Sequence, residues 1–174
     1  MNQPVEARAD FESFIARYPR HQLSKEARLW RALSFFAERD YATALEALKL
    51  LAPMVKGGRL EPEVAYRIAS TCYAMRDHEL ALSSINAYLN KYPQHTRTDE
   101  ARVLLGDIEM GRGELATARA IFTQISPNAG HLFVYSAFQA GKILRAVAGA
   151  AENKVARERL LCLLYTSPSP RDPS

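Results

Sequence analysis

The side chains best suited to chemistry are a few histidines and cysteines. They are His21, His78, His95, His131, Cys72 and Cys162. His21 and His95 each follow a Tyr-Pro dipeptide, and paired histidines can hold a metal ion or move a proton. However, the sequence contains no glycine-rich phosphate loop and no GxSxG, HExxH or CxxC motif. We therefore expect no catalytic residues, no metal site, no cofactor and no enzyme activity.

The end of the chain departs from the pattern of the rest. Residues 162–172, CLLYTSPSPRD, match the translation of a transposase adaptor used in sequencing libraries. The alternative is a natural disordered tail rich in serine and proline. We expect native sequence over residues 1–161 and a non-native tail over 162–174. Cys72 is then the single native cysteine, which excludes an intramolecular disulfide.

Composition narrows the class of partner. The net charge is +4 over 174 residues, and basic residues are interleaved with acidic ones along the chain, as on solvated helix faces. This distribution is unlike the concentrated basic stripe of a nucleic-acid-binding protein. No apolar run approaches the roughly 18 residues that a membrane span requires.

The sequence repeats itself with a period of 37 residues. FIARYPRHQLSKEAR, residues 14–28, aligns with YLNKYPQHTRTDEAR, residues 88–102, at an offset of two periods. The intermediate copy is visible in residues spaced one period apart: Asp40, Asp77 and Glu114, then Ala44, Ala81 and Ala118, then Leu48, Ile85 and Phe122. Such periodicity predicts stacked supersecondary units. His21 and His95 then lie two units apart, too far to share an ion, which favours structural roles for both.

Apolar residues recur every three or four positions within each unit, which predicts amphipathic helices. We expect helices at 4–17, 24–38, 41–55, 61–75, 78–91, 98–111, 115–125, 131–148 and 152–161, and no strand. The unit boundaries carry helix punctuation: Ser24 and Thr98 can cap first helices, and Asp40 and Asp77 second helices. Cys72 and Trp30 are expected in the core. The chain then begins with the second helix of one unit and continues through about four helix pairs, and we expect it to be truncated at both ends.

These units resemble tetratricopeptide repeats. The resemblance rests on a small residue in each first helix, a bulky residue after it, a polar turn, and an alanine in each second helix. The small residues are Ala32, Ala69 and Gly106. The resemblance implies an all-α fold, a solenoid of antiparallel helix pairs, in which small residues allow close helix approach.

The family binds protein or peptide segments in a concave groove lined by first helices. Aligned with the groove positions of the family are Leu29, Leu33, Phe36, Tyr66, Ser70, Tyr73, Val103, Asp107 and Met110. The Lys, Arg and Asn set that clamps a C-terminal carboxylate in part of the family is not found here. Each of the nine can instead be buried between neighbouring pairs, and the sequence leaves both alternatives open.

The resemblance therefore implies a non-catalytic scaffold for a partner protein. The YP ending followed by a long loop and EA is similar to repeats of Gram-negative envelope proteins. These include the lipoprotein of the outer-membrane barrel-assembly machine and the periplasmic coordinator of the Tol-Pal system, which suggests a periplasmic or envelope-associated protein. The alternative is a cytoplasmic regulatory or sensor module attached to an effector domain outside this sequence.

Overall fold

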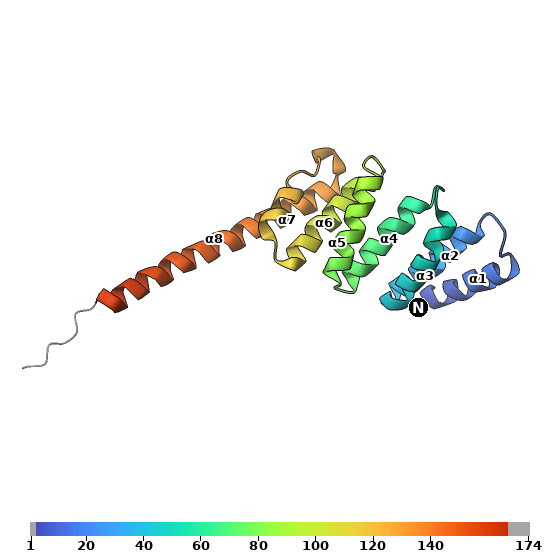
Figure 1. The fold of residues 1–174 in the computed structure, drawn as a ribbon, viewed down its shortest axis with the longest axis horizontal. Coiled ribbons are helices and arrows are strands. Elements are labelled where there is room, and N and C mark those ends of the chain that lie inside the picture. The colour runs from blue at the N-terminus through green and yellow to red at the C-terminus, as the bar shows by residue number, and fades with distance from the viewer. Residues whose placement is uncertain (1–2, 167–174) are drawn as a thin grey trace, which may run out of the picture.

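The computed structural model describes residues 3–166. Every regular secondary-structure element within this range is a helix. The α-helices are α1 (Gln3–Arg17), α2 (Ser24–Ala37), α3 (Tyr41–Val55), α4 (Glu61–Ala74), α5 (His78–Lys91), α6 (Thr98–Arg112), α7 (Leu115–Phe122) and α8 (His131–Thr166), with a 3-10 turn η1 (Pro127–Ala129) before α8. Consecutive helices pack on one another in chain order (Figure 1). The all-α solenoid expected from the sequence is confirmed.

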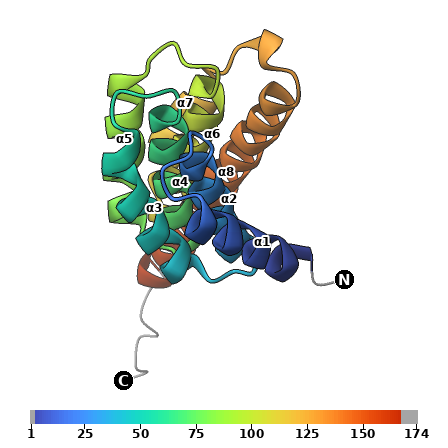
Figure 2. The ribbon, with the colours of Figure 1, turned by 90° about the vertical axis from the view of Figure 1, so that its right-hand side faces the viewer.

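Three complete helix pairs form the centre of the array: α2 with α3, α4 with α5, and α6 with α7. In the view of Figure 2, α3 and α5 lie on one side of the array and α8 on the other. Helix α1 precedes the first pair and corresponds to the second helix of a repeat unit. Helix α8 follows the last pair and corresponds to the first helix of a unit. The part of α8 beyond the array projects away from it (Figure 1).

The last expected pair is not formed. The sequence predicts a turn between residues 148 and 152, but α8 runs without a break from His131 to Thr166. The segment AGAAENK carries no proline, and its alanines favour helix strongly enough to continue it. Helix α7 also ends earlier than expected, at Phe122. Of the expected non-native tail, residues 162–166 belong to α8, and residues 167–174 lie outside the described residues.

The two helices of each pair approach closely where they carry small residues. Ala32, Ala44, Ala69, Ala81 and Ala118 have no exposed surface. In the third pair, the small residue is Gly106, and a Cβ atom placed there would lie 2.6 Å from the ring of Phe122. The close approach that the repeat pattern predicts is thus present in each pair.

The turns inside the pairs share one backbone geometry. Residues Arg39, Arg76 and Gly113, spaced by the repeat period, all have positive φ, at 63°, 62° and 86°. In the first two turns, the next residue is an aspartate whose side chain accepts a hydrogen bond from a backbone N–H of the second helix, as expected for Asp40 and Asp77. The left-handed residue reverses the chain, and the cap starts the next helix.

The expected caps at Ser24 and Thr98 are wrong. Both residues are the first residue of their helix, and neither preceding residue makes a side-chain cap. Thr98 Oγ1 instead donates to the carbonyls of Tyr92, at 3.1 Å, and His95, at 2.7 Å. Its hydroxyl therefore fastens the loop between pairs.

Candidate protein-binding face

The first helices carry all nine residues predicted to line a groove, but their contacts differ. Leu29 and Val103 are buried, with 5% and 8% of their surface exposed. Leu29 belongs to a core cluster with Leu48 of α3, and Val103 to one with Phe122 of α7. Both therefore pack against the second helix of their own pair.

Four further residues also contact the second helix of their own pair, but their side chains remain half-exposed. The Phe36 ring lies 5.1 Å from that of Tyr41, measured between centroids, and Tyr73 lies 5.9 Å from His78. Tyr66 lies 5.9 Å from the buried Tyr88. Met110, the fourth, packs against the cluster that contains Phe122. These side chains offer a partner only part of their surface.

The remaining three, Leu33, Ser70 and Asp107, are half-buried. Leu33 packs against the core cluster that contains Leu29 and Leu48, and the Ser70 hydroxyl donates to the carbonyl of Arg67 within its own helix. Asp107 links two first helices, because its Oδ1 accepts a 2.8 Å hydrogen bond from the hydroxyl of Tyr135 in α8. These three positions are spaced by the 37-residue period on successive first helices.

Sequence reasoning misplaced Trp30 of α2. It is expected in the core, but 54% of its surface is exposed. The repeat gives no consistent signal at this position, since the residue one period later is the charged Arg67 and the residue two periods later is the buried Leu104. The sequence does not predict Tyr135 either, because its contact with Asp107 depends on the packing of α8 against α6.

Burial perturbs the pKa values at the junction of α6 and α8. Burial raises the pKa of Asp107 above its usual value of 3.8, against the opposing effects of the Tyr135 hydrogen bond and the positive charge of Lys142. It also raises the pKa of Tyr135 to about 12. Gln139 Nε2 donates to the Tyr135 hydroxyl at 2.6 Å, so the hydroxyl lies between Gln139 and Asp107.

Replacing Asp107 by asparagine is therefore expected to stabilise the fold near neutral pH. A carboxyl whose folded-state pKa is raised prefers to be protonated, so its ionisation costs stability above its usual pKa, and this cost vanishes as pH falls through the raised value. The asparagine amide would keep an oxygen that accepts from Tyr135. Because Asp107 is half-exposed and screened, the gain at about pH 7 should be at most about 1 kcal/mol, and smaller near pH 4.

Urea unfolding of Asp107→Asn and the wild type at both pH values measures this difference. Asp99→Asn is a suitable control, because Asp99 pairs at the surface with Arg102. A loss of stability in Asp107→Asn at pH 7, or a gain independent of pH, would contradict the assignment.

His21 and His95 each pack against aromatic side chains near the end of the preceding second helix. His95 Nδ1 lies 3.0 Å from the hydroxyl of Tyr88, and its ring packs at an edge against the rings of Tyr88 and Tyr92. His21 repeats this arrangement with Phe14 and Tyr18. No cluster of side chains able to hold a metal ion occurs within the described part of the chain.

Cys72 is fully buried, as expected. Burial raises the pKa of its thiol. Both features disfavour the thiolate, which is the reactive form.

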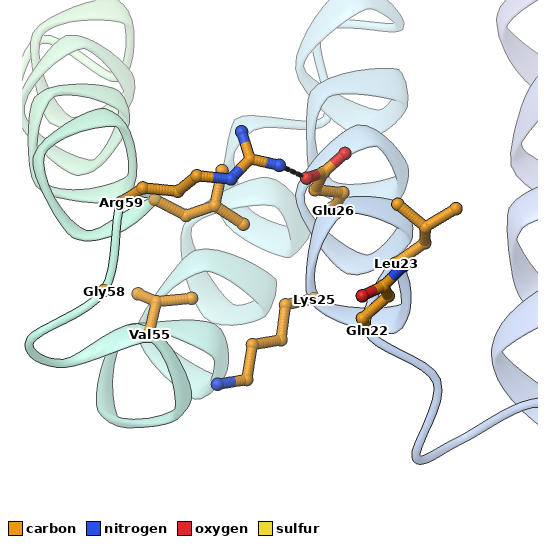
Figure 3. Close-up of a pocket in the computed structure, with 8 residues that line it drawn as sticks. Gln22, Leu23, Lys25, Glu26, Val55, Gly58 and Arg59 are labelled. Carbon is orange, nitrogen blue, oxygen red and sulfur yellow. Dashed lines mark ion pairs between the residues drawn. The ribbon is translucent and has the colours of Figure 1, made fainter.

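A pocket of about 380 Å³ lies at the loop edge of the array, between the start of α2 and the loop that joins α3 to α4. Figure 3 shows the Arg59 side chain reaching across it to the carboxylate of Glu26, with which it forms an ion pair. The ion pair of Glu63 with Arg97 repeats this link one unit later. The pocket is open to solvent, and its Glu26–Arg59 ion pair links α2 to the loop between α3 and α4.

The fold and the exposed first-helix face define a tetratricopeptide-type repeat protein. The chain is similar to two crystal structures of a Podosopora anserina protein described as a putative kinesin light chain with nearly identical TPR-like repeats, one of them carrying a single substitution. Both have a TM-score of 0.70 and 13% sequence identity. The match to the substituted form covers 92% of this chain and 86% of that one, and the other covers 96% and 90%. At this identity the likeness shows the fold.

The particular family follows from a second comparison. The family model described as "YfiO: Outer membrane lipoprotein" matches residues 35–126, just over half of the chain. The chain therefore belongs to the YfiO family. A comparison with curated proteins gives no significant match. Within the described residues, no helix has the length and apolarity needed to cross a bilayer.

Proposed function

We propose that this protein is a non-catalytic scaffold that holds a segment of a partner protein along its first helices during assembly of the bacterial cell envelope. The observation that carries the proposal is the face formed by successive first helices, which bears Trp30, Leu33, Ser70, Asp107 and Tyr135. Trp30 and Tyr135 are exposed, and the other three are half-buried. Membership of a family of outer membrane lipoproteins supports the envelope setting.

The chemistry of this face suits an extended or helical peptide with mixed apolar and polar side chains. Tryptophan and tyrosine are enriched among the residues that dominate binding energy in protein interfaces. Arg67 and Arg97 both lie over the ring of Tyr66, at 5.9 and 5.5 Å from its centroid, and both form ion pairs with Glu63. The border of this aromatic surface therefore carries both signs of charge, and a partner segment with an apolar anchor and polar flanks would fit it.

Site-specific photo-crosslinking tests the proposal and requires no candidate partner. A photoreactive amino acid would replace Leu33, Ser70 or Asp107 on the first helices, with the exposed Lys49 and Asn86 on second helices as controls. We expect the three first-helix positions to crosslink the same protein in the periplasm of a Gram-negative host, and the control positions to give no such product. Crosslinks from both faces alike, or from neither, would contradict the scaffold.

The compartment needs its own arm of this experiment. The same variants would be produced in parallel in the cytoplasm and, with an added export signal, in the periplasm. Crosslinking confined to the cytoplasm would overturn the envelope role and support the regulatory alternative.

A further inference from the structure

A second surface lies on the second-helix side of the array, where α3 and α5 stand (Figure 2). A groove of about 230 Å³ lies there between α3 and α5, with α4 between them. Its lining is largely apolar and includes Ala52 of α3, Ala65 and Ile68 of α4, and Ala87 of α5. Helix pairs precede and follow this groove in the array, and it is still open. An open groove between successive second helices is therefore a feature of the repeat itself.

The preceding groove of this kind, between α1 and α3, carries arginines where the next one is apolar. Arg28 and Arg31 of α2 stand one period before Ala65 and Ile68, so by the repeat they face α1 and α3. Both arginines are half-buried, and the Nε atom of each is buried without a hydrogen-bond partner. Within the described part of the chain, neither takes part in an ion pair.

Two repeats later the same position shows an arginine that has its partner. Arg102 corresponds to Arg28, and its guanidinium forms a 3.1 Å ion pair with Asp99, three residues earlier in α6. The residue of α2 that corresponds to Asp99 is Lys25, which is exposed. Helix α2 therefore lacks the internal carboxylate and carries an additional positive charge in its place.

The neighbouring helices do not supply the missing carboxylate. Glu12 of α1 and Glu46 of α3 are exposed, and neither pairs with an arginine of α2 among the described ion pairs. Glu38, beyond the end of α2, already pairs with Arg8 of α1 at 2.7 Å. Removing part of a guanidinium group from water without a partner costs free energy. An anionic group from outside the chain would offset that cost.

Exposed apolar side chains border the two arginines. Leu50 and Met54 of α3 stand one period before Ala87 and Lys91, which line the next groove. Leu50 is 72% exposed and Met54 41%, and Tyr18, which follows the last residue of α1, is 45% exposed. Arginine and aromatic residues are enriched in protein interfaces, as is methionine. We call these residues the arginine patch: Tyr18, Arg28, Arg31, Leu50 and Met54.

We propose that the arginine patch binds an acidic segment of a partner protein. Carboxylates of the segment pair with the two guanidinium groups, and its apolar side chains cover the exposed leucine and methionine of α3. The planar guanidinium group suits this role because it donates two parallel hydrogen bonds to one carboxylate. The patch lies on the second helices and is separate from the first-helix face, so it does not depend on the function proposed for that face.

The surroundings of the patch favour a protein segment over a nucleic acid. A nucleic-acid backbone carries a continuous row of negative charges, and the exposed carboxylates of Glu12 and Glu46 lie on the same two helices that border the patch. An acidic protein segment can place its few carboxylates at the arginines alone and cover Leu50 with an apolar side chain.

A random peptide library displayed on phage tests the proposal. It would be selected on the whole chain and counter-selected on the double variant Arg28→Ala/Arg31→Ile, which carries the residues found one repeat later. This variant should fold, which circular dichroism and Tm would verify. The recovered peptides should combine Asp or Glu with large apolar residues. As synthetic peptides they should bind each single variant roughly thirtyfold more weakly than the wild type, because one partner of a charge pair is lost.

Three controls isolate the patch. Arg102→Ala removes the arginine at the same place in the third pair, where a partner is already present, and should leave peptide affinity unchanged. Trp30→Ser changes the first-helix side and should also have no effect, so a failure of the first-helix proposal leaves this result standing. Peptides in which Gln and Asn replace Glu and Asp should lose binding.

Several results would overturn the proposal. They are a selection that yields no peptide dependent on the two arginines, recovered peptides without acidic residues, and an equal loss of affinity in Arg102→Ala. A single-stranded oligonucleotide that binds with the same arginine dependence and displaces the peptides would overturn it as well. Should the double variant fail to fold, Leu50→Glu replaces an exposed residue and should abolish peptide binding by repelling the acidic segment.

Discussion

Replacing Tyr88 by alanine is expected to lower the free energy of unfolding by about 3–5 kcal/mol, the usual cost of truncating a buried aromatic side chain. Tyr88 is 1% exposed, and its ring contacts those of Tyr66, Tyr92 and His95. Its hydroxyl also lies 3.0 Å from His95 Nδ1. Urea denaturation followed by circular dichroism measures the loss.

The matched control is Phe14→Ala, because Phe14 occupies the same position two repeats earlier. Phe14 is only half-buried, since it lines an open groove between α1 and α2. We expect a loss of about half that of Tyr88→Ala, in proportion to the smaller area removed from water. Equal losses for the two variants would contradict the picture of a filled groove at α5 and an open one at α1.

Tyr88→Phe separates the ring from the hydroxyl. It should cost about 1 kcal/mol, the typical net value of one hydrogen bond. A much larger loss would mean that the hydroxyl, and not the packing of the ring, dominates this site.

Replacing Gly106 by alanine is expected to be destabilising even though alanine favours helix by about 1 kcal/mol over glycine. The new Cβ would lie 2.6 Å from Phe122 Cε1, closer than van der Waals contact allows. Phe122 is 1% exposed and cannot move away freely. Overpacking of this kind costs about 1–3 kcal/mol.

Gly141→Ala in α8 provides the control. Nothing lies within 4 Å of a Cβ there, so only the propensity term acts and the variant should gain up to about 1 kcal/mol. The difference in free energy of unfolding between the two variants measures the overpacking. A gain of stability in both variants would show that α6 and α7 can separate without cost.

A double-mutant cycle identifies Phe122 as the obstacle. Phe122→Leu should cost less in the Gly106→Ala background than in the wild type, because the smaller side chain leaves room for the new methyl group. Additive effects would place the strain elsewhere.

The local architecture could be predicted from the sequence because each helix carries its own signals. The 37-residue period, the spacing of apolar residues and the aspartates at second-helix starts are all local features, and each described α-helix begins within one residue of an expected position. The largest error concerns the helix end expected at residue 148, which is absent. That end depended on a pairing that would have buried the open face of α8, and periodicity alone does not show that the pairing fails.

The candidate site could be predicted only in part. The alignment placed the nine residues on the correct helices, but the side of a first helix that faces its own second helix differs from the open side by a rotation of little more than one residue. Leu29 and Val103 were therefore selected although they are buried, while Trp30, one residue from Leu29, was assigned to the core although it is exposed. Their use in partner binding stays a prediction.

The sequence by itself determined the fold class, the repeat unit and the absence of recognisable catalytic motifs, because these follow from residue types and their spacing along one chain. Tertiary structure decided which apolar faces are covered. Phe14 and Tyr88 occupy equivalent positions with the same helical pattern, yet one borders an open groove and the other is buried, since only α5 has a first helix packed over it. Burial depends on the neighbour that each face meets, and that neighbour lies a whole repeat or more away in the sequence.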